Sequence, residues 1–226
     1  MTSFLIDAAK YYKSEPHQDQ AWEELEAKLP KYLLKEFMAA YRGSPEPPVG
    51  LVVLTKQTFE QLTGYRADLF TKQEVSDCNR MLKETGFADD PELTAMLMAN
   101  ILHETGNMKY MKEIANGWAY EGRSDLGNTQ PGDGPRFKGA GVLQLTGRYN
   151  YSRLSKALTD SRVMEGCEYV SSTYPFRSAE PWIQENRLLD VAKTEGFEAV
   201  CVRINGGYNG YDDRKTKYKI CRDILC

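Results

Sequence analysis

Carboxylates in the middle of the chain offer the clearest chemistry. Glu104 lies near the end of the run PELTAMLMANILHETG, residues 91–106, and Glu113 follows nine residues later. Two carboxyl groups can cleave a glycosidic bond when one protonates the leaving oxygen and the other takes a proton from the attacking water. Spacing alone leaves Glu121 and Asp125 as competitors of Glu113. Each of these loop carboxylates also fits an ordinary solvated surface.

A helix over residues 91–104 is expected to position Glu104. Asp90 is a good N-cap, Pro91 suits the first helical position, and Gly106 is a natural C-terminal stop. Counting back in helical steps places Glu104 in line with an apolar stripe formed by Ile101, Leu97 and Leu93. A carboxyl held against apolar side chains keeps its proton more readily, as a general acid requires. The alternative is that the last turn emerges into water and leaves the glutamate solvated.

Other catalytic classes lack their residues. His103 and Glu104 resemble the start of the zinc motif HExxH, but its second histidine is replaced by Asn107, and His17 is the only other histidine. The five cysteines show no CxxC pairing, which favours free thiols in a reducing compartment over a disulfide frame or a zinc site. No glycine-rich phosphate loop joins a strand to a helix. We therefore expect no metal and no cofactor.

Bulk properties are those of an ordinary globular protein. The chain has 226 residues, a formal net charge of −3 and a pI near 5.6, which does not suggest a nucleic-acid binder. It has no apolar run of spanning length, so we expect no stable membrane insertion. The start, MTSFLIDAAKYYKSE, has neither the basic nor the apolar region of a secretory signal peptide, so we expect the protein to accumulate in cytoplasm.

The pattern divides the chain into two parts. Residues 1–42 are expected to form short helices that either pack on the rest of the chain or bind a ligand, and GSPEPPVG at residues 43–50 is expected to be an extended linker. Within residues 51–226 the expected elements are helices with caps at Thr55 and Thr71, the helix over residues 91–104, a long loop, a strand over residues 142–148, and helices over residues 149–158, 188–205 and from residue 212 or 213.

Three motifs resemble those of the family 19 glycoside hydrolases. HETGNMKYMKE at residues 103–113 is similar to the family's HExxG...E segment, in the short form of bacteriophage endolysins, where the second glutamate follows the first by nine positions. FKGAGVLQLTGRYNY at residues 137–151 resembles FKGRGxIQLTGRxNY, and INGGYNGYDDR at residues 204–214 resembles INGGxNGxxxR. One departure is Ala140, which stands where the family has an arginine, so its charge is missing or is replaced by Lys138 or Arg136.

The resemblance assigns roles by matching position. Glu104 corresponds to the general acid, Glu113 to the general base, and Thr146 to the hydroxyl residue that helps hold the attacking water. Gln144 and Asn150 correspond to substrate-binding polar residues, and Asn205 and Arg214 correspond to cleft positions of the family. His103 precedes the acid and is a candidate to orient it. Tyr110 and Trp118 lie within or beside the motifs and are candidates to stack on sugars. The family's inverting chemistry implies carboxyl groups about 6.5 to 9.5 Å apart.

The resemblance also implies a fold and an activity. It implies a mainly helical, α+β lysozyme-like fold with two lobes, a cleft and a small β element. It implies an inverting muramidase-like endolysin that hydrolyses β-1,4 bonds of bacterial peptidoglycan. We expect such a protein to be a monomer that stays in the cytoplasm of an infected host until its release. The alternatives are a chitinase acting on poly-N-acetylglucosamine and a catalytically inactive sugar-binding protein on the same scaffold, a reading that Ala140 favours.

Overall fold

The computed structural model describes residues 51–226, of which residues 54–226 form one compact unit. The helices expected within residues 1–42 and the linker at residues 43–50 lie outside the described residues. The described chain is mainly helical, with short 3-10 turns between the helices and no extended strand. The helices are α4 (Lys56–Thr63), α5 (Lys72–Glu84), α6 (Pro91–Glu104), α7 (Asp133–Arg136), α8 (Arg148–Leu158), α9 (Cys167–Thr173), α10 (Glu180–Glu185), α11 (Leu188–Thr194), α12 (Phe197–Asn205) and α13 (Tyr211–Leu225).

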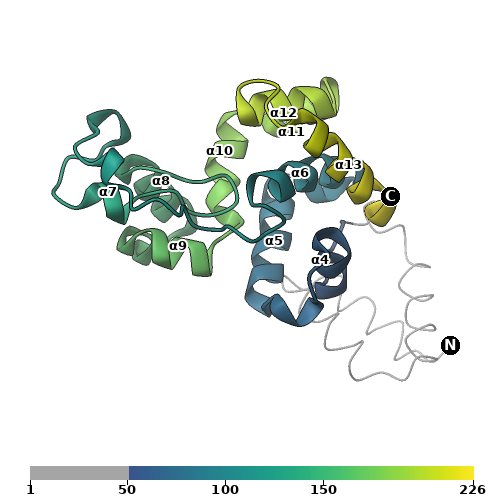
Figure 1. Ribbon diagram of the computed structural model, residues 1–226, viewed down its shortest axis with the longest axis horizontal. Coiled ribbons are helices and arrows are strands. Elements are labelled where there is room, and N and C mark those ends of the chain that lie inside the picture. Colours follow the sequence, from purple (N-terminus) through teal and green to yellow (C-terminus); the bar gives the residue numbers. More distant parts are fainter. Residues whose placement is uncertain (1–50) are drawn as a thin grey trace, which may run out of the picture. The chain divides into compact units, whose positions relative to one another are not determined.

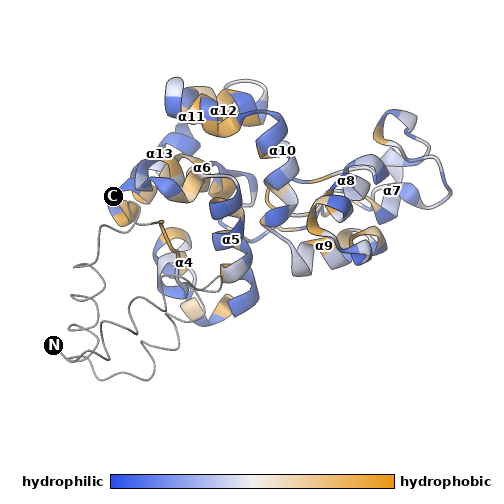
Figure 2. Cartoon of the chain, turned by 180° about the vertical axis from the view of Figure 1, so that it is seen from behind, coloured by the Kyte–Doolittle hydropathy of each residue, from blue (hydrophilic) through white to orange (hydrophobic). Residues whose placement is uncertain are grey.

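Helix α6 is the centre of one group of helices, and its expected bounds are confirmed. The Asp90 carboxylate accepts hydrogen bonds from the backbone N–H groups of Glu92 (2.7 Å) and Leu93 (3.3 Å), as an N-cap should. Every residue from 93 to 102 is buried, so the helix is covered on all sides rather than along one stripe. Helix α13 packs along it, and Figure 2 shows the hydrophobic colouring of α6. Burial holds the middle of the helix firmly and leaves its two ends, including Glu104, partly exposed.

The caps of the two preceding helices are also confirmed. Thr55 is the N-cap of α4 and Thr71 is the N-cap of α5. Each forms a reciprocal capping box with the residue three positions later. These caps depend on neighbouring residues only, which is why the sequence pattern is sufficient to place them.

The helices fall into two groups within residues 54–226. Helices α7, α8 and α9 lie together, α4, α5, α6, α11, α12 and α13 lie together, and α10 runs between the groups (Figure 1). The first group has its own core, formed by Phe137, Ala140, Tyr151, Leu154, Val163, Cys167 and Val170. The expected two-lobed, lysozyme-like helical architecture is therefore present.

The segment before α10 ties the two groups together. The buried Asp77 of α5 accepts backbone hydrogen bonds from Phe176 (2.7 Å) and Arg177 (3.1 Å). On the other side of this segment, the N–H of Val142 donates to the carbonyl of Pro175 at 2.8 Å. Residues 175–177 thus bridge α5 to the loop that precedes α8.

The prediction of a strand over residues 142–148 is wrong. Residues 141–144 form a turn, and Gln144 has a positive φ of 53°, which is incompatible with an extended strand. The β structure of the described chain is reduced to two isolated antiparallel bridges, from Ala140 to Lys112 and from Ala140 to Leu145. Helix α8 then begins at Arg148, close to its expected start.

The single helix expected over residues 188–205 is also wrong. It is divided into α11 and α12, because Gly196 adopts a φ of +80° between them. The last helix is confirmed, although α13 begins at Tyr211, just before the expected aspartates.

All five cysteines are free, as expected. Cys78, Cys167, Cys201 and Cys221 are buried and Cys226 is exposed. None of the helices over residues 51–226 is long and apolar enough to span a membrane.

Candidate active site

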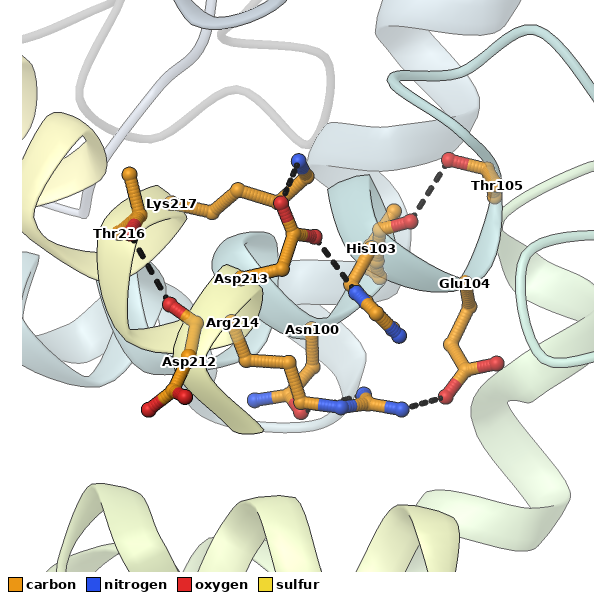
Figure 3. Close-up of polar contacts among 10 residues, drawn as sticks. Asn100, His103, Glu104, Thr105, Asp212, Asp213, Arg214, Thr216 and Lys217 are labelled. Carbon is orange, nitrogen blue, oxygen red and sulfur yellow. Dashed lines mark hydrogen bonds and ion pairs between the residues drawn. The ribbon is translucent and has the colours of Figure 1, made fainter. Parts of the chain in front are cut away.

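Glu104 lies at the end of α6, where a buried arginine holds it. Arg214 of α13 is only 1% exposed, and its guanidinium donates through Nη1 to Asn100 Oδ1 (2.8 Å) and through Nη2 to Glu104 Oε1 (Figure 3). Asn100 lies one turn before Glu104 on the same helix and donates to the carbonyl of Met96. The glutamate side chain is 29% exposed, and its Oε2 atom has no hydrogen-bond partner within residues 51–226. One oxygen is therefore fixed by Arg214, and the other has no protein partner in the described chain.

His103 lies beside the acid but belongs to a second contact. Its Nδ1 atom is 2.6 Å from Asp213 Oδ2, and the other oxygen of Asp213 accepts a hydrogen bond from Lys217 at 3.0 Å (Figure 3). Burial opposes the charge on Asp213, but the contacts with His103 and Lys217 outweigh it and lower the pKa of this carboxyl. The backbone of Gly210 lies so close that an added Cβ would stand 2.3 Å from the imidazole. His103 therefore fixes the end of α6 against the start of α13.

Glu113 is supported by a different part of the chain. Its Oε2 accepts a hydrogen bond from the backbone N–H of Gly139 (2.8 Å), and its Oε1 accepts one from the Tyr120 hydroxyl (3.2 Å). A backbone bond from the N–H of Glu113 to the carbonyl of Gly139 (2.9 Å) fixes the same pair of residues. Partial burial and the Glu113 charge raise the pKa of Tyr120, so this phenol stays protonated and able to donate. Glu121 and Asp125, the competing carboxylates, are bound elsewhere, to the backbone of residues 132 and 134 and to Arg123.

The polar residues of the QLTGRYN segment lie next to Glu113. A Cβ added at Gly139 would stand 2.4 Å from Gln144 Oε1 and 3.1 Å from Glu113 Oε2, so both side chains flank this glycine. The Thr146 hydroxyl donates to the carbonyl of Gln144 at 2.8 Å, and Asn150 donates to the carbonyl of Thr146 at 2.9 Å. Gln144, Thr146 and Asn150 also line one cavity of about 250 Å³. The structure therefore brings together four of the predicted site residues.

The remaining predicted residues have mixed positions. Tyr110 and Trp118 are 43% and 59% exposed, which leaves their rings accessible for stacking on a sugar. Asn205 is the last residue of α12, and its buried Nδ2 atom has no partner among the described residues.

The family arginine has no evident substitute. Ala140 is fully buried in the core of the α7–α9 group. The Lys138 ammonium donates to the carbonyl of Ala115 at 2.7 Å, and Arg136 lines a separate cavity with Arg162 and Glu165. In the described part of the chain, neither cation bonds to Glu104 or Glu113, so the charge at this position is missing.

The supporting roles of four residues were not predicted from the sequence. Asn100 was detectable, because it is a polar residue one turn before Glu104 in a largely apolar helix. Gly139 and Asp213 lie inside the quoted motifs and Tyr120 lies beside them, but the contacts that these three residues make depend on the tertiary fold. Within residues 51–226, no group of three or more acidic, histidine or cysteine residues is arranged to hold a metal ion.

No protein-family model matches the chain. Over 100 residues it is 31% identical to a glycosyl hydrolase family 19 domain-containing protein of Haemophilus influenzae, covering 44% of this chain and 48% of that protein. Over 118 residues it is 36% identical to an endochitinase of Arabidopsis thaliana, covering 51% and 40%. The matches thus span less than half the length of these relatives.

Solved structures extend the likeness over more of the chain. Chitinase C from Streptomyces griseus superposes with a TM-score of 0.58 at 22% identity, covering 78% of this chain and 93% of that one. The class IV family 19 chitinase of Zea mays gives a TM-score of 0.60 at 22% identity, with coverages of 76% and 92%. The chain has the fold of the family 19 chitinases. In sequence, parts of the chain are similar to family 19 proteins.

Proposed function

We propose that this protein is a glycoside hydrolase that cleaves β-1,4 bonds between N-acetylated amino sugars with inversion, and that its substrate is bacterial peptidoglycan. The observation that carries the proposal is the separate support of two carboxyl groups nine residues apart. Glu104 is held by Arg214, and Glu113 is held by Gly139 and Tyr120. Inverting hydrolysis needs one carboxyl on each side of the scissile bond, with room for water beside the base.

Glu104 is proposed as the general acid. Arg214 orients the carboxyl through Oε1, so the proton that passes to the leaving oxygen is placed on Oε2, the atom with no protein partner in the described chain. Once the proton has left, Glu104 is an anion beside a buried guanidinium. A fixed cation at the atom where negative charge develops stabilises the transition state without reorganisation.

Glu113 is proposed as the general base. The Gly139 N–H and the Tyr120 hydroxyl orient its carboxylate, so that it can take a proton from a water molecule on the opposite face of the sugar. Gln144 flanks the same glycine, and Thr146 is fixed to the backbone of Gln144. These two side chains are proposed to hold the water and the sugar, with Asn150 beside them in the cavity.

Peptidoglycan is favoured over chitin by the short HETG...E motif, which resembles that of bacteriophage endolysins. On this proposal the protein is a monomer that waits in the cytoplasm of an infected bacterium until it is released to the cell wall. Chitin is the second candidate, because relatives in both comparisons are chitinases.

Mass spectrometry of borohydride-reduced products tests the proposal. The wild-type protein is incubated with purified peptidoglycan and, separately, with chitin oligomers. New reduced amino-sugar ends from peptidoglycan are expected, with muramic acid ends marking a muramidase and glucosamine ends a glucosaminidase. Glu104→Gln should abolish them, whereas Glu60→Gln, an exposed control on α4, should not. If products form from chitin alone, chitin and not peptidoglycan is the substrate. Binding of either glycan without products would contradict hydrolysis.

A further inference from the structure

The cavity beside Thr146 extends beyond the residues needed for cleavage. One side is formed by the loop with Gln144 and Thr146, and the other by Pro181, Trp182 and Glu185 of α10. Its volume of about 250 Å³ is below that of most small-molecule sites. It therefore suits one substituent of a sugar rather than a further stretch of glycan.

An ion pair lies in the wall of this cavity. Arg153 of α8 donates through Nη1 to Glu185 Oε2 of α10 at 2.7 Å. Several other arginine pairs of the surface join residues within one turn, such as Arg162 with Glu165. The Arg153–Glu185 pair instead joins residues that are 32 positions apart in the sequence and belong to two helices, α8 and α10, beside the cavity.

Arg153 still has donors to offer. Among the described residues, its only hydrogen bond is the one from Nη1, and its side chain is 34% exposed. The guanidinium carbon lies 5.7 Å from the ring centre of Tyr149, which limits the positions of the side chain. The Nε and Nη2 atoms are therefore free, and this edge of a guanidinium matches the two oxygens of a carboxylate.

We propose that this cavity is a subsite for a carboxylate carried on the sugar, bound by the Nε and Nη2 atoms of Arg153. The inference rests on the proposed hydrolysis of peptidoglycan, and it names the part of that substrate that the site selects. In peptidoglycan, N-acetylmuramic acid carries a lactyl ether whose carboxyl group is either free or linked to a peptide with carboxylates of its own. Chitin offers only hydroxyl and acetamido groups. Arg153 thereby favours glycans that carry a carboxylate.

Glu185 has the opposite effect. Its carboxylate shares Arg153 with the incoming anion, and like charges near one cation repel each other. Removing the charge of Glu185 should strengthen binding of a carboxylate-bearing glycan, while removing that of Arg153 should weaken it. If the Arg153–Glu185 pair served only to hold α8 against α10, substitution of either residue would break the same contact. The preference for carboxylate-bearing glycans over chitin would then not change in opposite directions in the two variants.

The test compares kcat/KM on three soluble glycans of equal length: one with intact peptides, one with the peptides removed so that the lactyl carboxylate is free, and a chitin oligomer. For Arg153→Met, we expect the ratio of carboxylate-bearing glycan to chitin oligomer to fall by about tenfold to a hundredfold. For Glu185→Gln the ratio should rise. Loss on both peptidoglycan forms identifies the lactyl carboxylate, and loss only on the intact form identifies a peptide carboxylate.

Arg162→Met is the matched control. Arg162 is also paired with a glutamate (3.0 Å) and lies over a tyrosine ring (4.5 Å), but it does not line this cavity. Its ratio should stay within twofold of wild type. If wild type cleaves peptidoglycan and Arg153→Met keeps the wild-type ratio, only the subsite is refuted. If wild type cleaves no peptidoglycan, the proposed substrate and the subsite both fail.

Discussion

Asp77 makes the stability of the fold depend on pH. Its carboxyl is 1% exposed, with Oδ2 bound to the N–H groups of Phe176 and Arg177 and Oδ1 buried without a partner in the described structure. Burial raises the pKa of Asp77 from 3.8 to about 7, and the negative charge of Glu180 adds slightly to this rise. The two N–H groups and the positive charge of Arg177 act in the opposite direction but do not outweigh burial. The folded protein therefore holds this proton more tightly than the unfolded chain does.

The sign of the effect follows from the two pKa values. The contribution of protonated Asp77 to folding is complete below about pH 4, decreases as the pH rises, and is lost above about pH 7. Between pH 5 and pH 7 the folded state keeps the proton and the unfolded state does not. Two pH units at about 1.4 kcal/mol each correspond to a loss of about 3 kcal/mol in the free energy of unfolding.

Asp77→Asn should remove this dependence. The asparagine side-chain oxygen can still accept from the N–H groups of Phe176 and Arg177, but it has no proton to lose near neutral pH. The free energy of unfolding is measured by urea denaturation at pH 5 and pH 8 for wild type, for Asp77→Asn, and for Asp223→Asn as an exposed control. Relative to the variant, wild type should lose about 3 kcal/mol between these pH values. An equal pH dependence in wild type and Asp77→Asn would refute the assigned protonation.

Two further substitutions test the surroundings of Glu113 and the buried position of Ala140. Gly139→Ala should lower kcat strongly with little change in melting temperature, because the new Cβ would meet Gln144 Oε1 at 2.4 Å and Glu113 at 3.1 Å; Gly207→Ala, which meets nothing within 4 Å, should retain activity. Normal kcat in Gly139→Ala would contradict the placement of these two side chains. Ala140→Arg, which restores the family residue, should lower the melting temperature, because the site is fully buried among apolar side chains. A stable, more active Ala140→Arg variant would show instead that this pocket accepts the charge.

Features set by neighbouring residues could be predicted from the sequence. Asp90 and Pro91 mark the start of α6, and Thr55 and Thr71 mark the starts of α4 and α5, because a cap needs only residues within one turn. The motif that resembles family 19 contains Gln144, Thr146 and Asn150, which line one cavity in the structure.

Features set by the tertiary fold could not be predicted in this way. The alternation in VLQLTGR indicated a strand, but the positive φ of Gln144 turns the chain and brings its side chain beside Gly139. The division between α11 and α12 depends on a single glycine whose left-handed conformation the apolar pattern did not reveal. The hydrogen bond from Tyr120 to Glu113 joins two residues of one irregular loop. The sequence of this loop has no periodic pattern from which the bond could be predicted.

The proposed roles of Glu104 and Glu113 as the acid and base of an inverting hydrolase can be tested directly. Proton NMR of a chitin oligomer or a soluble peptidoglycan fragment during the first minutes of hydrolysis identifies the anomer that forms before mutarotation. We expect the α-anomer to appear first with wild type, and no product to form with Glu104→Gln or Glu113→Gln. Initial release of the β-anomer, or unchanged turnover in either variant, would contradict it.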